Sequence, residues 1–192
     1  EAVYTNGGKI ISKDNTLTSK IGYYNSVSKE FTFKKDVVLS NPQYVMNCDT
    51  LRYNTASKVA YFVGPTTIKG SDNFIYCEDG WYDTFRDVSK FSRNSYIITQ
   101  KQKLKGDSLY YDRKKAIGKA KKNIEIIDTT QNITIKGNYA EHYELTNQSV
   151  VTGEAVLIQV YDNDTLFLHA DTLKALNKIQ NTDSSKGEDN KI

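Results

Sequence analysis

The chain has 192 residues, of which 38% are hydrophobic, and 26 Lys and Arg against 23 Asp and Glu give a net charge of +3. This near balance does not predict a nucleic-acid partner, and no apolar run approaches the ~18–20 residues that a membrane-spanning helix needs. The hydrophobic content is below the ~45–50% that is usual for compact domains, which favours an elongated shape. Fourteen Tyr and only two Pro favour strands over helices.

The two ends of the chain each carry a short segment typical of a strand. Val3-Tyr4-Thr5 and Lys9-Ile10-Ile11 form the first, and Thr165-Leu166-Phe167-Leu168 forms the last. We expect both to be end strands with unpaired backbone groups, which predicts head-to-tail association by strand addition. No positively charged segment followed by an apolar one opens the chain, so we expect any export signal to be already removed or never present.

A seven-residue motif recurs along the chain, and its best copy is Gly106-Asp107-Ser108-Leu109-Tyr110-Tyr111-Asp112. Tyrosines at 24, 53, 82 and 111 fix the step at 29 residues. Each copy begins with a small residue, at Ser19, Cys48, Cys77, Gly106, Gly137 and Ala170. A fixed period of this size is typical of stacked units that cannot bury their apolar faces alone.

Each unit contains two apolar segments separated by polar turns. Tyr44–Asn54, the turn 55–58 and Val59–Val63 are an example, rich in β-branched and aromatic residues. A unit of 29 residues is therefore one pass out and one pass back, and such a meander must fold over to bury its apolar side. This predicts an elongated, all-β, antiparallel two-sheet sandwich or open jelly roll. A parallel β-helix is the alternative, disfavoured because polar turns occur twice per unit.

Side chains within the motif are expected to alternate between the two faces of a strand. Leu109 and Tyr111 share the inward parity, whereas Gly106 and Tyr110 share the other. The small residue that opens each copy suggests crowding where the strand bends across the fold.

An acidic residue follows the small one in most copies, as in Asp49, Glu78 and Asp107. These carboxylates could form a ladder of metal ligands. Lys20 and Asn138 occupy the same position in other copies, however, which favours a role as hydrogen-bonding residues at a turn or bend. We therefore expect no metal site.

Cys48 and Cys77 occupy equivalent positions one unit apart. Two antiparallel passes separate them by about 9–10 Å, which exceeds the ~7 Å limit between the Cα atoms of a disulfide. We predict that both are unpaired and buried.

Catalytic patterns are scarce in this chain. His142 and His169 are the two histidines, and although His169 and Asp171 could share one face of a strand, such pairs are common on strand surfaces. No metalloprotease, nucleophile-elbow or phosphate-loop motif occurs. We expect neither catalysis nor a cofactor.

A basic cluster provides nine Lys and Arg within 22 residues, from Lys101 to Lys122. At the rim of a groove these cations could meet lipid phosphates or an anionic membrane surface. The alternative is a solvated face on which lysines prevent edge-to-edge pairing.

The repeat resembles the OstA/LptA-like repeat proteins, and the bacteroidete-type branch is especially similar. The resemblance runs from about residue 3 to 176 and is closest at Leu109-Tyr110-Tyr111-Asp112, Gly118-Lys119-Ala120 and Gly153-Glu154-Ala155-Val156. It implies a periplasmic β-jelly roll, open along one side, that carries lipopolysaccharide or a related lipid toward the outer membrane. It further implies head-to-tail association with itself or with other jelly-roll transport proteins, as a bridge or as part of a larger outer-membrane assembly protein.

The resemblance also implies a division of the chain and a set of site residues. Residues 1–180 would form a single array, followed by a polar, disordered tail or linker at 181–192. Phosphates would meet a rim formed by Lys105, Arg113, Lys114 and Lys115. Acyl chains would lie in a groove between the sheets, lined by Phe31, Phe33, Leu51, Tyr53, Phe62, Tyr82, Leu109, Tyr111, Ile126, Ile135 and Leu157. Two alternatives stay open, in which the same residues form the filled core of a structural or adhesive scaffold or the array is a polysaccharide-cleaving β-solenoid.

Overall fold

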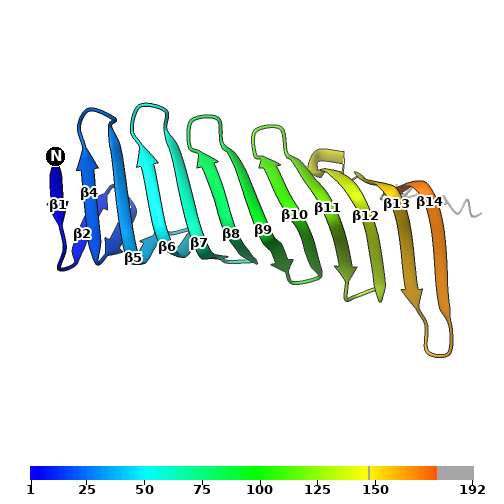
Figure 1. Cartoon of the computed structure of the whole chain (residues 1–192). Coiled ribbons are helices and arrows are strands. Elements are labelled where there is room, and N and C mark those ends of the chain that lie inside the picture. The colour runs from blue at the N-terminus through cyan, green and yellow to red at the C-terminus, as the bar shows by residue number, and fades with distance from the viewer. Residues whose placement is uncertain (147, 177–192) are drawn as a thin grey trace, which may run out of the picture.

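The computed structural model describes residues 1–146 and 148–176, which form one antiparallel sheet of fourteen strands (Figure 1). A 3₁₀ turn at Glu144–Thr146 is the single helical segment of these residues. The strands are β1 (Ala2–Tyr4), β2 (Gly8–Ser12), β3 (Asn15–Ser19), β4 (Ile21–Asn25), β5 (Glu30–Ser40), β6 (Tyr44–Asn54), β7 (Val59–Gly70), β8 (Asn73–Asp83), β9 (Val88–Thr99), β10 (Gln102–Asp112), β11 (Ile117–Asp128), β12 (Ile133–Tyr143), β13 (Gln148–Val160) and β14 (Thr165–Leu176).

Strand order follows the chain from β4 to β14, each strand pairing antiparallel with the next (Figure 1). At the N-terminal end, β1 pairs with β4, and β2 pairs with β3, which in turn pairs with β5. The first two passes of the chain are therefore each split into two short strands. The antiparallel meander is confirmed over the parallel β-helix, and the predicted end strands are confirmed as β1, β2 and β14.

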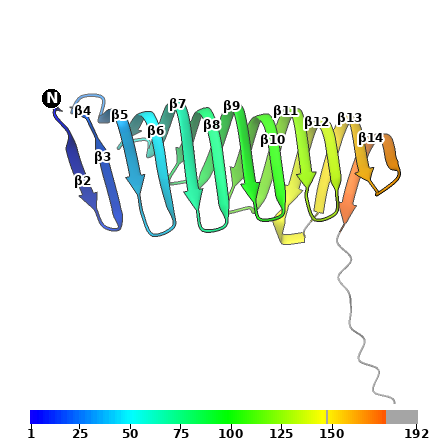
Figure 2. The same cartoon turned by 90° about the horizontal axis from the view of Figure 1, so that it is seen from below.

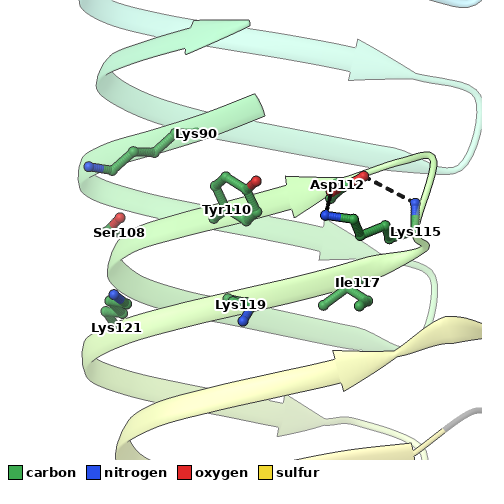
Figure 3. Close-up of a pocket in the computed structure, with 8 residues that line it drawn as sticks. All are labelled: Lys90, Ser108, Tyr110, Asp112, Lys115, Ile117, Lys119 and Lys121. Atoms are coloured by element: carbon green, nitrogen blue, oxygen red, sulfur yellow. Dashed lines mark hydrogen bonds and ion pairs between the residues drawn. The ribbon is translucent and has the colours of Figure 1, made fainter. Parts of the chain in front are cut away.

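Every long strand is interrupted near its middle by a shift in pairing register. The shifts fall, for example, between Lys34 and Val37 in β5 and between Lys121 and Ile124 in β11. Backbone with positive φ occurs at these points, at Asp36, Asn94 and Asn123 and at Gly64. Such bulges bend a strand sharply, and the ribbons turn from one layer into a second (Figures 2 and 3). The sheet therefore folds over itself, which confirms the predicted folded-over, all-β architecture.

Strict alternation is wrong at these bends. Gly106 and Leu109 are both buried although they lie three residues apart. The register of β10 shifts between Gly106 and Ser108, so that one extra residue is accommodated without a partner. The small residue that opens the motif does lie where the strand bends, as predicted.

The acidic residues of the motif hydrogen-bond across the bends. Asn94 Nδ2 donates to Glu78 Oε1 at 2.8 Å, and Asn123 Nδ2 donates to Asp107 Oδ2 at 2.9 Å. In the first unit Lys20 Nζ lies 2.5 Å from a carboxylate oxygen of Asp36. The interpretation as bend hydrogen-bonders is therefore confirmed for Glu78 and Asp107. Within the described ranges, no three His, Cys, Asp or Glu side chains form a group that could hold a metal ion.

The 29-residue step is the spacing of the hairpin turns. Asn54 Oδ1 accepts hydrogen bonds from the backbone N–H groups of Ala56 and Ser57, and Asp83 Oδ1 does the same one unit later. Each turn also contacts the preceding one, since Thr84 N–H donates to the carbonyl oxygen of Lys58 at 3.0 Å. Asx turns thus fix the hairpins that follow β4, β6, β8 and β10 in the same register.

The core lies in the crease, which is the line of bulges along which the sheet folds over. It contains side chains from both layers. The buried apolar residues are Leu17, Phe33, Val37, Met46, Cys48, Leu51, Phe62, Cys77, Phe91, Leu109, Ala120, Ile124, Ala140, Val151 and Ala155. Both cysteines are free and buried, as predicted. Burial raises the pKa of each thiol to about 12, so that neither provides a thiolate at neutral pH. The predicted tail at 181–192 lies outside the described residues.

Packing in the crease predicts a contrast between two glycines. A Cβ at Gly80 would overlap the Phe62 ring and lie 2.7 Å from the carbonyl oxygen of Lys90, whereas a Cβ at Gly118 would meet its nearest atoms at 3.9 Å. We expect Gly80→Ala to lower the free energy of unfolding by about 1–3 kcal/mol. Gly118→Ala is the control and should change it by less than about 0.5 kcal/mol. Urea denaturation measures both, and equal values would contradict the packing described here.

Candidate lipid groove and outer face

The predicted groove residues fall into two groups. Four of them are buried in the crease, with exposed fractions of 5% for Phe33, 3% for Leu51, 1% for Phe62 and 2% for Leu109. The other seven are half-buried, and they are Phe31, Tyr53, Tyr82, Tyr111, Ile126, Ile135 and Leu157. The deepest part of the interior is therefore packed, and the half-buried residues offer accessible apolar surface.

An apolar strip runs across the inner face of the last four strands. Ile126 is the cross-strand neighbour of Ile135, Ile135 of Leu157, and Leu157 of Leu168. The first three are half-buried, and Leu168 on β14 is 48% exposed. Apolar surface thus becomes more accessible toward the β14 end of the fold.

Tyrosines of the motif form a polar border between the interior and the hairpin turns. The hydroxyl of Tyr82 donates to Asp87 at 2.7 Å, and that of Tyr111 donates to Glu144 at 2.6 Å. Burial, followed by these hydrogen bonds, raises the pKa of both hydroxyls to about 12. They remain protonated donors at any physiological pH.

Three residues of the predicted phosphate rim lie together in the turn after β10, but each has a different partner. Arg113 lies at the tyrosine border, 3.9 Å from Asp87. Lys114 Nζ donates to the carbonyl oxygen of Phe85 at 2.9 Å, and Lys115 Nζ lies 3.2 Å from Asp112. Lys105 belongs to the bend of β10 rather than to the hairpin.

A trough that sequence reasoning did not anticipate lies on the outer face of β9, β10 and β11, with a volume of about 490 Å³. Its lining residues are Lys90, Ser108, Tyr110, Asp112, Lys115, Ile117, Lys119 and Lys121 (Figure 3). Lys119 and Lys121 belong to the basic cluster of the sequence, but Lys90 comes from the preceding unit. The 29-residue period could have shown that Lys90 and Lys119 share a face, because they are one period apart.

Next to the trough, Glu141 on β12 accepts hydrogen bonds from three donors. Lys119 Nζ lies 2.7 Å from Glu141 Oε1, and the hydroxyls of Tyr139 and Tyr143 also donate to the carboxylate. Lys119 first, and then the two tyrosines, lower the pKa of Glu141 to about 2. The carboxylate is thus the preferred form of this group in the folded chain.

This cluster predicts a pH-dependent contribution to stability. Because folding lowers the pKa of Glu141 from 4.5 to about 2, its stabilisation is present above pH 4.5 and is lost as the pH falls toward 2. We expect Glu141→Gln to reduce the free energy of unfolding at pH 7 by roughly 1–2 kcal/mol, with the difference from wild type vanishing near pH 2. Urea titrations across this range test the prediction. Glu125→Gln is the control, since in the described part of the chain Glu125 forms an ion pair only with Lys136, at 3.5 Å. An equal loss there would contradict the assignment.

Comparison with known proteins gives matches to a family model and to solved structures. A family model described as OstA-like protein matches residues 1–49. The solved structure of LptH, titled the LptA homologous periplasmic component of the conserved lipopolysaccharide transport device from Pseudomonas aeruginosa, has a TM-score of 0.54 and 14% sequence identity, and the match covers 59% of this chain and 93% of LptH. No curated protein matches the chain.

These matches agree with the folded-over sheet. The resemblance seen in the repeat is confirmed, because the chain is similar to OstA-like proteins over its first 49 residues and has an LptA-like β-jelly-roll fold.

No helix within residues 1–146 and 148–176 has the length and apolarity needed to cross a bilayer.

Proposed function

We propose that this chain is a non-catalytic periplasmic carrier or bridge that moves lipopolysaccharide, or a related lipid, toward the outer membrane. The acyl chains lie along the apolar strip of Ile126, Ile135, Leu157 and Leu168, on the inner face of the folded sheet. Partial exposure of this strip is the observation that carries the proposal, since a lipid requires apolar surface that the core has not already covered. The LptA-like fold and the OstA-like segment support the same role.

Polar groups near the hairpin turns complete the proposed path. Arg113 is the member of the predicted rim that stands beside the inner tyrosines, and we assign it the contact with lipid phosphate. Its planar guanidinium suits bidentate binding of a phosphate better than the ammonium of a lysine does. Lys114 and Lys115 already contact Phe85 and Asp112, and Lys105 lies at the bend of β10. We therefore assign these three lysines a smaller part in phosphate binding.

Site-specific photo-crosslinking tests the proposed groove. We expect a benzoylphenylalanine at Ile135 or Leu157 to form adducts with lipopolysaccharide, because both side chains belong to the accessible inner strip. The same probe at Tyr61 is the control, since Tyr61 is exposed but belongs to the outer parity of β7. Immunoblots with an antibody against the lipid report the adducts. Adducts absent from both inner positions, or equally strong from Tyr61, would refute the groove.

A structural scaffold is the second candidate function, and the packed crease favours it. Phe33, Leu51, Phe62 and Leu109 leave almost no exposed surface where the two layers meet. A scaffold needs the filled crease and makes no use of the apolar strip. The crosslinking experiment therefore decides between the two functions, because a scaffold predicts no lipid adduct from Ile135 or Leu157.

We also propose that copies of the chain, or related jelly-roll proteins, associate head to tail. Within the described residues β14 pairs only with β13, and its Leu166, Phe167 and Leu168 are 48–58% exposed. At the opposite end, among the fourteen described strands, β1 pairs only with β4 and β2 only with β3. Two free edges of one antiparallel sheet can add to each other and extend the inner face from one protomer into the next.

Positive charge introduced on the β14 edge is expected to weaken this association. Lysines on an edge strand oppose pairing, so Phe167→Lys/His169→Lys should raise the concentration at which oligomers form by about tenfold, or about 1.4 kcal/mol of association free energy. Light scattering across a concentration series measures this. Tyr61→Lys/Val63→Lys, two exposed positions on an interior strand, is the control. A wild-type protein that stays monomeric throughout would refute the proposal.

A further inference from the structure

The outer trough is built around one strand with cations on both sides. On β10, Tyr110 lies opposite Lys90 of β9 and Lys119 of β11, and Ser108 lies opposite Lys121 of β11. In Figure 3, Tyr110 occupies the middle of the trough, with Lys90 and Lys121 toward one end. Asp112 and Lys115 stand at the opposite end (Figure 3).

Charge in the trough is unevenly neutralised. Lys115 is paired with Asp112 at 3.2 Å, and Lys119 with Glu141 at 2.7 Å. Among residues 1–146 and 148–176, Lys90 and Lys121 take part in no ion pair. Their end of the trough therefore carries two positive charges that no carboxylate neutralises, which makes it complementary to an anion with more than one charge.

Neutral hydrogen-bonding groups stand between these cations. In the described part of the chain, the hydroxyls of Ser108 and Tyr110 have no protein partner, and each can donate and accept one hydrogen bond or more. Two free ammonium groups and two free hydroxyls around one hollow form a set of donors that suits the oxygens of a phosphate monoester.

The size of the trough and the Tyr110 ring in its lining suit a ligand larger than an inorganic ion. A volume of about 490 Å³ falls within the ~300–1,000 Å³ of ordinary small-molecule sites. Tyr110 is the aromatic residue of the lining, and Trp81 lies beside the trough, opposite Lys90 on β8. Aromatic rings bordered by hydroxyl and ammonium donors provide both apolar faces and polar partners, which are the two features that a sugar ring needs.

We propose that the outer face of β9, β10 and β11 is a binding site for a phosphorylated saccharide. The phosphate lies between Lys90, Lys121 and Ser108, and the sugar ring lies against Tyr110 toward Lys119. A hollow with its cations at one end favours such a discrete headgroup over a flat membrane surface. This site goes beyond the proposed lipid groove, because it lies on the other face of the sheet and uses none of the inner strip.

The test is a titration of the purified chain with glucose 6-phosphate, followed by backbone amide NMR. We expect shifts at Lys90, Ser108, Tyr110 and Lys121. Lys90→Gln/Lys121→Gln should weaken binding about tenfold, as loss of two partly exposed charge contacts implies. Lys9→Gln/Lys69→Gln removes the same charge from two exposed lysines elsewhere and should leave the affinity unchanged. Inorganic phosphate and glucose should each bind more weakly than glucose 6-phosphate.

Each departure from this pattern overturns a stated part of the proposal. Shifts absent from the trough, or an equal loss in the control variant, would refute the site. Inorganic phosphate binding as tightly as glucose 6-phosphate would refute the saccharide. Sedimentation with phosphatidylcholine vesicles containing phosphatidylglycerol, if it depended on Lys90 and Lys121 while glucose 6-phosphate caused no shift, would assign the face to membranes instead. Lipid crosslinking from Leu157 should be unaffected by Lys90→Gln/Lys121→Gln, so failure of the trough and failure of the groove are distinguishable.

Discussion

A bend in the middle of every long strand is the constraint on which this structure depends. A flat antiparallel meander of this length would expose a whole apolar face and could not be stable alone. The bulges near Asp36, Gly64, Asn94 and Asn123 fold the sheet so that its two halves cover each other. A left-handed residue other than glycine costs about 1–2 kcal/mol, whereas full burial of a side chain such as Phe62 or Leu109 stabilises by about 1.5–3 kcal/mol. Burial repeated in every unit therefore outweighs the local strain.

Folding one sheet over itself gives the molecule two different faces. The inner face is apolar, packed at residues such as Leu51 and Phe62 and half-buried along Ile126, Ile135 and Leu157. The outer face is polar and presents ion pairs, aromatic rings and the lysine trough. Because adjacent residues point to opposite faces, each strand of β9 to β11 contributes to both surfaces at once. A lipid on one face and an anionic headgroup on the other would thus not compete for side chains.

Much of the architecture could be predicted from the period alone. The 29-residue step predicted the hairpins, the antiparallel order and the separation of Cys48 from Cys77. It does so because an Asn or Asp that can form an Asx turn recurs with the same period. The positions of the bulges could not be predicted. The alternation of side chains between the two faces was taken to continue along each strand, and a bulge interrupts it. A signal was present, for Asp36, Asn94 and Asn123 stand mid-strand at the step of the repeat, and such residues tolerate left-handed backbone. Without the shift, Gly106 and Leu109 were assigned to opposite faces.

The amino-acid sequence by itself determined the repeat, the strands and their turns, because these depend on local backbone preferences and on side-chain alternation. Only the tertiary structure decided which apolar residues are covered, since Leu51 and Leu157 are equally apolar, yet Leu51 is buried and Leu157 is half-buried. It also decided that Lys90 joins Lys119 and Lys121 across three strands. Position across a folded sheet depends on the sum of all registers and bends, and no single segment contains that information.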